Sequence, residues 1–231
     1  MFDFKQFSID DSHCDMKVGT DGVLLGSWVN VENVHKVLDA GGGSGLIALM
    51  IAQRAHDAEV DCVEISADAC GDALKNIAAT PFSQRVRVIN ADITEHRFTE
   101  NNYDLIVSNP PYFTEALQSP EAGRATSRHE GVFGVEWLVK HSTDLLAPNG
   151  TLAFIAPTSR DGEIEFLIEL NRLHIMRRCK VIPVEGQPAK RTLWQISLKR
   201  LRPTENTTIV IRDRNRNLTP QYSMLTYEFY L

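Results

Sequence analysis

VHKVLDAGGGSGLIALMI, residues 34–51, joins a short apolar segment, a cluster of glycines and a second apolar segment. Val34–Leu38 is expected to form a β-strand, because it is short and apolar and is followed by an acid and glycines. Leu46–Ile51 is expected to lie in a helix, because its apolar residues recur at helical spacing. Glycines between the two allow the backbone to turn tightly and to approach a ligand closely. The stretch therefore predicts a strand, a glycine-rich turn and a helix.

The alternation of strand and helix continues along the chain. Further strands are expected at residues 60–63, 86–89, 105–107 and 152–155, and helices at residues 67–78, 135–146 and 163–171. This alternation predicts an α/β fold with a doubly wound, mostly parallel sheet and helices on both faces. Ile175–Pro183 and Thr192–Lys199 then resemble the two strands of a hairpin, joined by residues 184–191.

A seven-stranded, mostly parallel sheet that ends in an antiparallel hairpin resembles the Rossmann-like fold of class I S-adenosylmethionine-dependent methyltransferases. The sheets of dinucleotide-dependent dehydrogenases, in contrast, are parallel throughout. Beyond the hairpin, the apolar run Ile209–Ile211 predicts a C-terminal strand, and the aromatic residues at 227–230 predict a short packed end.

A chain of 231 residues suits one well-buried α/β domain better than two. We expect a single methyltransferase domain, residues 1–231, with a lead-in over the cofactor site (1–33), a core (34–200) and an extension (201–231). The composition is that of a soluble globular protein, and the longest apolar run, Gly45–Ala52, is too short to cross a membrane. Because the first residues lack a secretion signal, we expect a cytoplasmic protein without a membrane partner, and a monomer.

The cysteines and histidines do not have the spacing of a metal site. Cys14, Cys62, Cys70 and Cys179 stand singly, which argues against zinc and against a disulfide scaffold. None of the seven histidines belongs to an H-E-x-x-H or comparable pair. The sequence predicts free thiols and no metal.

The formal net charge of −6 argues against a nucleic-acid partner when it is taken alone. Residues 172–202, however, contain nine basic residues and a single acid. The basic residues are Arg172, Arg177, Arg178, Lys180, Lys190, Arg191, Lys199, Arg200 and Arg202. Such a block can bind phosphates, but two strands with charged, solvated faces would give the same pattern, and both interpretations stay open.

The glycine loop Asp39–Gly45 matches the pattern D-x-G-x-G-x-G. It does not match the dinucleotide pattern G-x-G-x-x-G, because Leu46 stands where the third glycine would be. Ligands of open α/β sheets bind beyond the carboxyl ends of the strands, so the loop predicts a site for S-adenosylmethionine. The residues assigned to this site are Asp39, Gly41, Gly43 and Gly45. A glycine-rich turn without a nucleotide function is the alternative.

Two further acids follow the next two expected strands. Glu64 ends the second strand, where a carboxylate can accept hydrogen bonds from both hydroxyls of a ribose. Asp92 follows the third strand, where methyltransferases that resemble this chain bind the adenine amine of the cofactor. We expect both acids, with the adjacent Ile65 and Ile93, to contact the cofactor. Each acid could instead be a helix N-cap or a surface residue.

The tetrapeptide NPPY, residues 109–112, follows the fourth expected strand. Methyl transfer to a planar amine is slow because the nitrogen lone pair is delocalised. The side-chain carbonyl of Asn109 and the backbone carbonyl of Pro110 can accept the amine hydrogens, and Pro111 stiffens the loop. Tyr112 offers a ring on which a base can stack. The motif predicts Asn109, Pro110 and Tyr112 as catalytic residues, with Asn109 also beside the cofactor; a proline-rich turn is the alternative.

Segments at both ends of the chain resemble the family that methylates N6 of the adenine beside the anticodon of a valine tRNA. They are Phe4–Phe7, Met16–Gly26, Thr192–Gln195 and Tyr227–Leu231. The resemblance implies transfer of a methyl group from S-adenosylmethionine to an adenine of tRNA. It also implies that Lys17, Thr20 and Asp21 lie over the cofactor, although Thr20 or Asp21 could instead cap a helix that runs to Val29.

Four basic residues are candidates for RNA contacts. Arg124 and Arg128 follow the NPPY motif and would reach a phosphate or the base if that loop closes over the substrate. Lys190 and Arg191 lie at the tip of the predicted hairpin, where an RNA backbone is easily met. For Arg124 and Arg128, a surface position without a role is the alternative.

Three other functions fit parts of the pattern. Release-factor glutamine methyltransferases share the tetrapeptide, because an amide nitrogen poses the same electronic problem, but they have a helical domain ahead of the glycine loop. Only 38 residues precede Asp39 here, which is too few for such a domain. A ribosomal RNA guanine-N2 methyltransferase is the second alternative. A non-catalytic RNA-binding scaffold is the third, and the presence of Asn109 and Tyr112 argues against it.

Overall fold

The structure, a computed structural model, describes residues 1–98, 102–111, 133–200 and 202–231. The strands are β1 (Phe2–Asp3), β2 (Ser8–Ile9), β3 (Lys36–Ala40), β4 (Glu59–Glu64), β5 (Val86–Asn90), β6 (Tyr103–Ser108), β7 (Leu146–Pro157), β8 (His174–Val184), β9 (Arg191–Ser197) and β10 (Glu205–Arg212). The α-helices are α1 (Thr20–Trp28), α2 (Leu46–Arg54), α3 (Ala67–Ala78), α4 (Val135–Leu145), α5 (Asp161–Leu170) and α6 (Pro220–Thr226).

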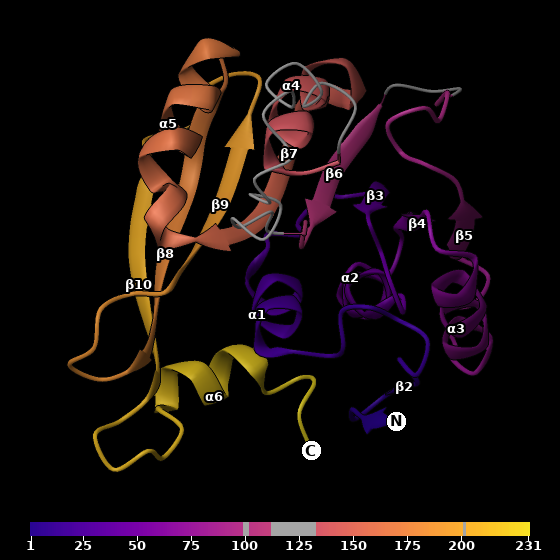
Figure 1. The fold of residues 1–231 in the computed structure, drawn as a ribbon, viewed down its shortest axis with the longest axis horizontal. Coiled ribbons are helices and arrows are strands. Elements are labelled where there is room, and N and C mark those ends of the chain that lie inside the picture. Colours follow the sequence, from indigo (N-terminus) through magenta and orange to yellow (C-terminus); the bar gives the residue numbers. More distant parts are fainter. Residues whose placement is uncertain (99–101, 112–132, 201) are drawn as a thin grey trace, which may run out of the picture.

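The strands from β3 onward form one sheet in the order β10-β8-β9-β7-β6-β3-β4-β5. Neighbouring strands are parallel except around β9, which is antiparallel to both β7 and β8. Figure 1 shows α4 and α5 in the upper half of the view and α1, α2, α3 and α6 in the lower half. The class I methyltransferase fold expected from the sequence is therefore confirmed, including its antiparallel hairpin.

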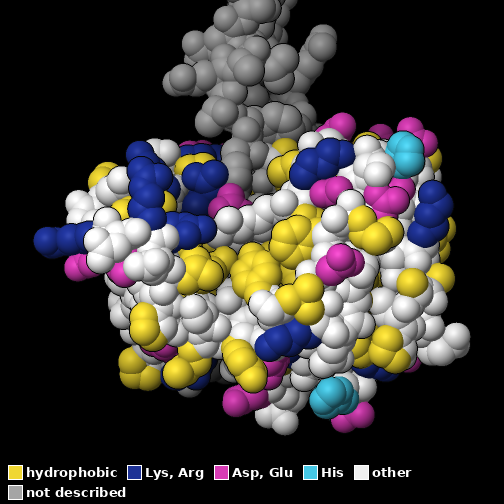
Figure 2. All heavy atoms as spheres, turned by 90° about the horizontal axis from the view of Figure 1, so that it is seen from below, with side chains coloured by type: hydrophobic (Ala, Val, Ile, Leu, Met, Phe, Trp, Pro, Cys, Tyr) yellow, Lys and Arg dark blue, Asp and Glu magenta, His cyan; other side chains and the backbone are white. Residues whose placement is uncertain are grey.

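The sheet has eight strands, so the expected number of seven is wrong. The additional strand is β10, which the apolar run around Ile209 predicts as a strand and which lies parallel to β8 with Ile209 opposite Val181. Without β10, β8 would be an edge strand with unpaired backbone groups, and β10 covers this edge while burying Ile209. Lys and Arg side chains gather beyond this end of the sheet, at the left of Figure 2.

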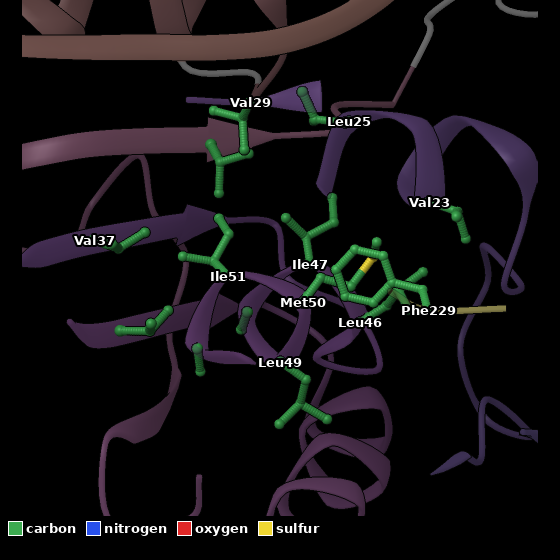
Figure 3. Packing of buried hydrophobic residues seen from close by; sticks show 14 of the residues in the cluster. Val23, Leu25, Val29, Val37, Leu46, Ile47, Leu49, Met50, Ile51 and Phe229 are labelled. Atoms are coloured by element: carbon green, nitrogen blue, oxygen red, sulfur yellow. The ribbon is translucent and has the colours of Figure 1, made fainter. Parts of the chain in front are cut away.

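The hydrophobic core lies on both faces of the sheet. Val37 packs with α1 and α2, whereas the next residue, Leu38, packs with α4 and α5. Such alternation is expected of a parallel strand that is buried on both faces. Figure 3 shows the first cluster, in which Val23 of α1 and Met50 of α2 lie near Phe229 of the C-terminal segment. The expected packed C-terminal end is thus confirmed.

Gly26 lets α1 pack closely on α2, and this contact places the lead-in beside the glycine loop. A Cβ at Gly26 would lie 2.6 Å from Sδ and 3.0 Å from Cβ of Met50. Met50 is fully buried, so its side chain has little room to move away. The absence of a side chain at position 26 is therefore a packing requirement.

We expect Gly26→Ala to lower the free energy of unfolding by about 1–3 kcal/mol, because the added methyl group overpacks the contact with Met50. Chemical denaturation followed by circular dichroism measures this change. Gly71→Ala in α3 is the matched control, because a Cβ there meets no described atom within 4 Å and alanine favours a helix. Equal losses of stability in the two variants would contradict the packing requirement.

Candidate active site

The glycine loop between β3 and α2 has a left-handed backbone at three positions, Gly41 (φ 74°), Gly43 (φ 54°) and Gly45 (φ 79°). Residues with side chains rarely adopt these angles, which explains the glycines. The N–H groups of Gly41 and Gly42 donate to the carbonyl of Val63 in β4, and Gly45 is the N-cap of α2. The loop is thereby fixed between β3, β4 and α2.

Two adjoining cavities open at the glycine loop. The first, which we call the lead-in cavity, has a volume of about 440 Å³ and lies between the loop and residues 16–22. The second, which we call the strand-end cavity, has a volume of about 190 Å³ and lies between the loop, the end of β4 and residues 91–93. Met16, Gly41, Gly43 and Asn109 line both cavities, so the two cavities meet at these residues.

Most of the predicted cofactor residues line these two cavities. The lead-in cavity has Lys17, Thr20 and Asp21 in its wall. The strand-end cavity has Glu64, Ile65, Asp92 and Ile93. Gly41, Gly43 and Asn109 belong to both. Asp39 and Gly45 line neither cavity. Asp39 is buried inside the protein, and Gly45 is the N-cap of α2.

Asp39 supports the glycine loop from inside the protein. Its side chain is fully buried, and its Oδ2 accepts a hydrogen bond of 3.0 Å from the N–H of Ala48 in the first turn of α2. Its Oδ1 has no hydrogen-bond partner in the described part of the chain. Burial raises the pKa of Asp39 to about 7, although the hydrogen bond from Ala48 acts in the opposite direction.

The acids at the ends of β4 and β5 make local hydrogen bonds at the wall of the strand-end cavity. Glu64 accepts from the N–H of Gly43 (2.9 Å) and of Ser66 (2.8 Å), so it ties the glycine loop to its own strand. The Oδ1 of Asp92 accepts from the N–H (2.8 Å) and the hydroxyl (2.7 Å) of Thr94. Asp92 therefore begins a turn, which is close to the capping role considered as the alternative.

Helix α3 fastens the lead-in to the glycine loop. Asn76 accepts from the N–H of Asp10 (2.9 Å) and donates to the carbonyl oxygens of Asp10 (2.8 Å) and Ser44 (3.0 Å). One turn earlier, Asp72 accepts from the N–H of His13 (2.8 Å) and lies 2.9 Å from its ring nitrogen. Burial acts to raise the pKa of Asp72, but the hydrogen bonds from His13 outweigh it and lower this pKa.

The charged residues of the lead-in cavity have partners of their own. The ammonium of Lys17 donates to two carbonyl oxygens of the lead-in, and Asp21 accepts from the Nε of Arg191 at 2.7 Å. α1 begins at Thr20, and its N-cap is Gly19, which has no side chain with which to cap the helix. The alternative in which Thr20 or Asp21 caps this helix is therefore wrong.

The NPPY loop leaves the sheet beside the glycine loop. The hydroxyl of Ser108 donates to the carbonyl of the last residue of β3 at 2.7 Å, which joins the ends of β6 and β3. Asn109 lines both cavities, Pro111 lines the strand-end cavity, and Pro110 is buried. Tyr112 lies outside the described residues. The structure thus brings the first residue of the motif to the junction of the two cavities.

Two residues of the site could not be predicted from the sequence. Cys14 and Phe133 line the strand-end cavity, and a Cβ at Gly41 would lie 2.8 Å from the Phe133 ring. Burial raises the pKa of Cys14 to about 11, so its thiol stays protonated at neutral pH. Only tertiary contacts bring these residues to the site. The one local sign is that Phe133 stands between the NPPY motif and an amphipathic helix.

The basic block of residues 172–202 is divided between the two ends of strands β8 and β9. Arg191 pairs with Pro157 at the end of β7. This places Arg191 and the exposed Lys190 at the carboxyl ends of the parallel strands, where the glycine and NPPY loops also lie. Ser197, at the other end of β9, pairs with Thr151 near the start of the same strand. The basic residues near this opposite end of the strands are Arg172, Lys199, Arg200 and Arg202.

Four residues of the block form ion pairs with acids from other segments. These pairs are Arg177–Glu205, Arg178–Glu165, Lys180–Asp161 and Arg191–Asp21. Their charges are balanced within the fold, so the block does not form one continuous basic surface. Arg124 and Arg128, the other candidates for RNA contacts, lie outside the described residues.

No group of three or more His, Cys, Asp or Glu side chains in the described ranges is arranged to hold a metal ion. The four cysteines are free and buried, which confirms the expectation of free thiols. None of the helices in the same ranges combines the length and the apolar character needed to cross a membrane.

We expect the buried Asp39 to make the stability of the protein depend on pH. Its pKa in the folded state is raised to about 7 from an ordinary value of 3.8, so stability should fall as the pH rises through this interval. Asp39→Asn keeps an acceptor for Ala48 and removes the titration. The stability of the variant relative to the wild type should therefore rise by roughly 1–4 kcal/mol across the interval. Denaturant unfolding at several pH values tests this, and parallel profiles would contradict it.

Known proteins resemble this chain over most of its length. Residues 12–175 match the family model described as methyltransferase small domain. A protein named tRNA1(Val) (adenine(37)-N6)-methyltransferase from Aeromonas hydrophila is 42% identical over 231 residues, covering 100% of this chain and 97% of the relative. The protein of the same name from Tolumonas auensis is 39% identical over 231 residues, covering 100% and 96%.

Solved structures share the fold at lower identity. The crystal structure of a predicted O-methyltransferase from Agrobacterium tumefaciens has a TM-score of 0.70 and 20% identity, covering 90% of this chain and 96% of the other. A TehB-like SAM-dependent methyltransferase from Corynebacterium glutamicum has a TM-score of 0.51 and 16% identity, covering 78% and 89%. Identities this low show the fold alone, whereas the full-length relatives show the family. The chain belongs to the family of tRNA1(Val) (adenine(37)-N6)-methyltransferases.

Proposed function

We propose that this chain transfers a methyl group from S-adenosylmethionine to N6 of adenine 37 in a valine tRNA, the reaction for which its relatives are named. The position of Asn109 is the main support. This residue begins the NPPY motif and lines both cavities at the glycine loop. One side chain therefore stands next to the space suited to the cofactor and in the loop suited to the amine.

The strand-end cavity suits the nucleoside of S-adenosylmethionine. Glu64 would accept hydrogen bonds from the ribose hydroxyls, and Asp92 would accept one from the adenine amine. Ile65 and Ile93 would contact the flat faces of the adenine. Two of these residues lie at the end of β4 and two after β5, so neighbouring parallel strands supply the whole set.

The lead-in cavity suits the amino-acid end of the cofactor. Asp21 and Lys17 would lie near its ammonium and carboxylate groups, and Thr20 adds a hydroxyl at the start of α1. Gly43 supports this fit, because a Cβ there would meet no described atom within 4 Å and would project into open space. A ligand can therefore approach the loop backbone closely at this point.

The residues of the NPPY loop would act by holding the amine. The side-chain carbonyl of Asn109 and the backbone carbonyl of Pro110 accept its hydrogens and orient the nitrogen lone pair. Bound S-adenosylmethionine supplies an electrophilic methyl group. Tyr112 would stack on the adenine, and the loop needs no strong base, because the product amine loses its proton readily to water.

We place the tRNA contacts on Lys190 and Arg191 at the β8–β9 connection and on Arg124 and Arg128 beyond the NPPY motif. Lys190 is exposed at the same sheet edge as the two cavities, and Arg191 is half buried beside it. A tRNA substrate is consistent with a cytoplasmic enzyme, and we expect it to act as a monomer.

We expect Gly43→Ala to weaken the binding of S-adenosylhomocysteine by about tenfold or more, because the methyl group occupies space at the junction of the cavities. Gly186→Ala is the matched control: Gly186 also has a positive φ (86°) and open space at its Cβ position, but it lies in the β8–β9 connection and lines neither cavity. Isothermal titration calorimetry separates the two. Equal binding by both variants would contradict the proposed cofactor position.

We expect Asn109→Ala to lower the turnover of tRNA methylation by ~100-fold or more and to change the affinity for S-adenosylhomocysteine only a few-fold. Loss of a carbonyl that acts on the amine has this signature. Asn102→Ala is the control, because Asn102 is exposed next to the other end of β6.

The same variants test the substrate in cells. Mass spectrometry of nucleosides should show that a strain lacking this chain loses N6-methyladenosine from a valine tRNA. The wild type and Asn102→Ala should restore it, whereas Asn109→Ala should not. An unchanged tRNA with an undermethylated release factor, or with loss of N2-methylguanosine from ribosomal RNA, would contradict the proposal and support one of the alternatives.

A further inference from the structure

We propose that Arg191 is a positioning residue for the cofactor site: its ion pair with Asp21 holds the start of α1 at the lead-in cavity and couples cofactor binding to the β8–β9 connection. This inference rests on the proposed function, which places S-adenosylmethionine in that cavity. From the sequence we expect Arg191 to contact RNA and Asp21 to contact the cofactor, whereas in the structure the two side chains form an ion pair.

The ion pair connects segments that are 170 positions apart. The Nε of Arg191 lies 2.7 Å from Oδ2 of Asp21, and the side chains are 33% and 26% exposed. Partial burial matters here, because an exposed pair of this kind would be screened by solvent and would hold little in place. The pair is therefore suited to fixing the position of one segment on the other.

Strand pairing on both sides fixes the backbone of Arg191. Arg191 pairs with Pro157 of β7 on one side and with Val181 of β8 on the other. The preceding residue, Lys190, donates its N–H to Val181 (2.9 Å) and accepts from the N–H of Thr158 (3.1 Å). Backbone hydrogen bonds on both sides thus fix this point of the sheet.

The aspartate side of the pair belongs to a less supported segment. Asp21 lies in the first turn of α1, and the N-cap of this helix is Gly19, which has no side chain with which to cap it. A carboxylate in the first turn interacts favourably with the helix dipole, so Asp21 also stabilises the start of α1. Breaking its bond to Arg191 would remove a contact that ties the first turn of α1 to β9 at the cavity wall.

The pair also lies close to the catalytic loop. β9 is separated from β6 by β7 alone, and neighbouring strands are about 4.8 Å apart, which places the backbone of Arg191 roughly 10 Å from the line of β6. Asp21 and Asn109 line the same lead-in cavity. A tRNA that contacts the β8–β9 connection would therefore lie next to Arg191, the residue that holds Asp21 in the wall of the lead-in cavity.

Such an arrangement makes the two ligands interdependent. If tRNA favours the position in which Arg191 holds Asp21, then it raises the affinity for the cofactor, and the cofactor must raise the affinity for tRNA by the same factor. We expect a factor of about five or more in the wild type, which is the lower end of typical coupling.

The test measures S-adenosylhomocysteine binding by calorimetry on the full chain, with and without the valine tRNA transcript. Arg191→Ala and Asp21→Asn should each weaken binding about fivefold or more, and the double variant should lose little beyond either single one. Both single variants should also lose the effect of tRNA. Arg191→Lys, which keeps the charge but not the geometry of the guanidinium, should recover part of the affinity.

Arg87→Ala is the matched control, because it breaks an Arg–Asp pair of 2.9 Å with Asp61 between β5 and β4, among residues that line neither cavity. It should bind S-adenosylhomocysteine as the wild type does. Thermal unfolding of each variant shows whether it is folded, and Arg191→Lys replaces Arg191→Ala as the decisive variant if the alanine variant does not fold.

Three results would overturn the inference alone. Unchanged affinity in Arg191→Ala would show that the pair does not position the cavity, and additive losses in the double variant would show that the two residues act separately. Independent binding of the two ligands by the wild type would remove the coupling. Failure of the wild type to bind S-adenosylhomocysteine at all would overturn the proposed function as well, so the two failures are distinguishable.

Discussion

The left-handed backbone of the glycine loop is the constraint on which the rest of the site depends. Gly41, Gly43 and Gly45 hold angles that side chains disfavour, and two carboxylates keep them there. Asp39 ties the start of α2 to β3 from inside, while Glu64 holds Gly43 from the cavity side. Because the burial of Asp39 opposes its ionisation, the protein keeps an energetically costly group at this place. Contacts within the protein thus fix the loop, and such preorganisation favours binding of a cofactor.

The lead-in completes the site because distant segments hold it in position. α3 binds it through Asn76 and Asp72, α2 receives α1 at Gly26, and β9 reaches Asp21 through Arg191. Each contact joins the first part of the chain to an element of the rigid core. The position of the cavity wall therefore depends on these few polar and packing contacts. Of the two carboxylates among these contacts, Asp72 is fully buried, whereas the side chain of Asp21 is 26% exposed, so solvent weakens the contact at Asp21 more than the contact at Asp72.

The sequence predicts the parts of this site that obey local rules. A glycine loop after an apolar strand, acids at successive strand ends and an NPPY tetrapeptide each have a meaning that depends only on neighbouring residues. The positions of Asn76, Phe133 and Arg191 in the site could not be predicted, because each depends on which elements pack together. Residue Ile209 shows the boundary between the two cases: its apolar run predicts a strand, but only the unpaired edge of β8 decides where that strand lies.

The basic block shows why charge counted along a sequence is a weak guide to RNA binding. Antiparallel strands run in opposite directions. Basic residues in a segment that spans β8 and β9 therefore lie at both ends of these strands. Strand pairing also brings acids of other segments beside it, and Arg177, Arg178 and Lys180 each meet one. Of the block's residues at the cofactor end of the sheet, Arg191 is paired with Asp21 and Lys190 is exposed. A count of bases along the sequence therefore overstates the charge that the block can present to one RNA surface, because strand pairing divides the block between both ends of the strands.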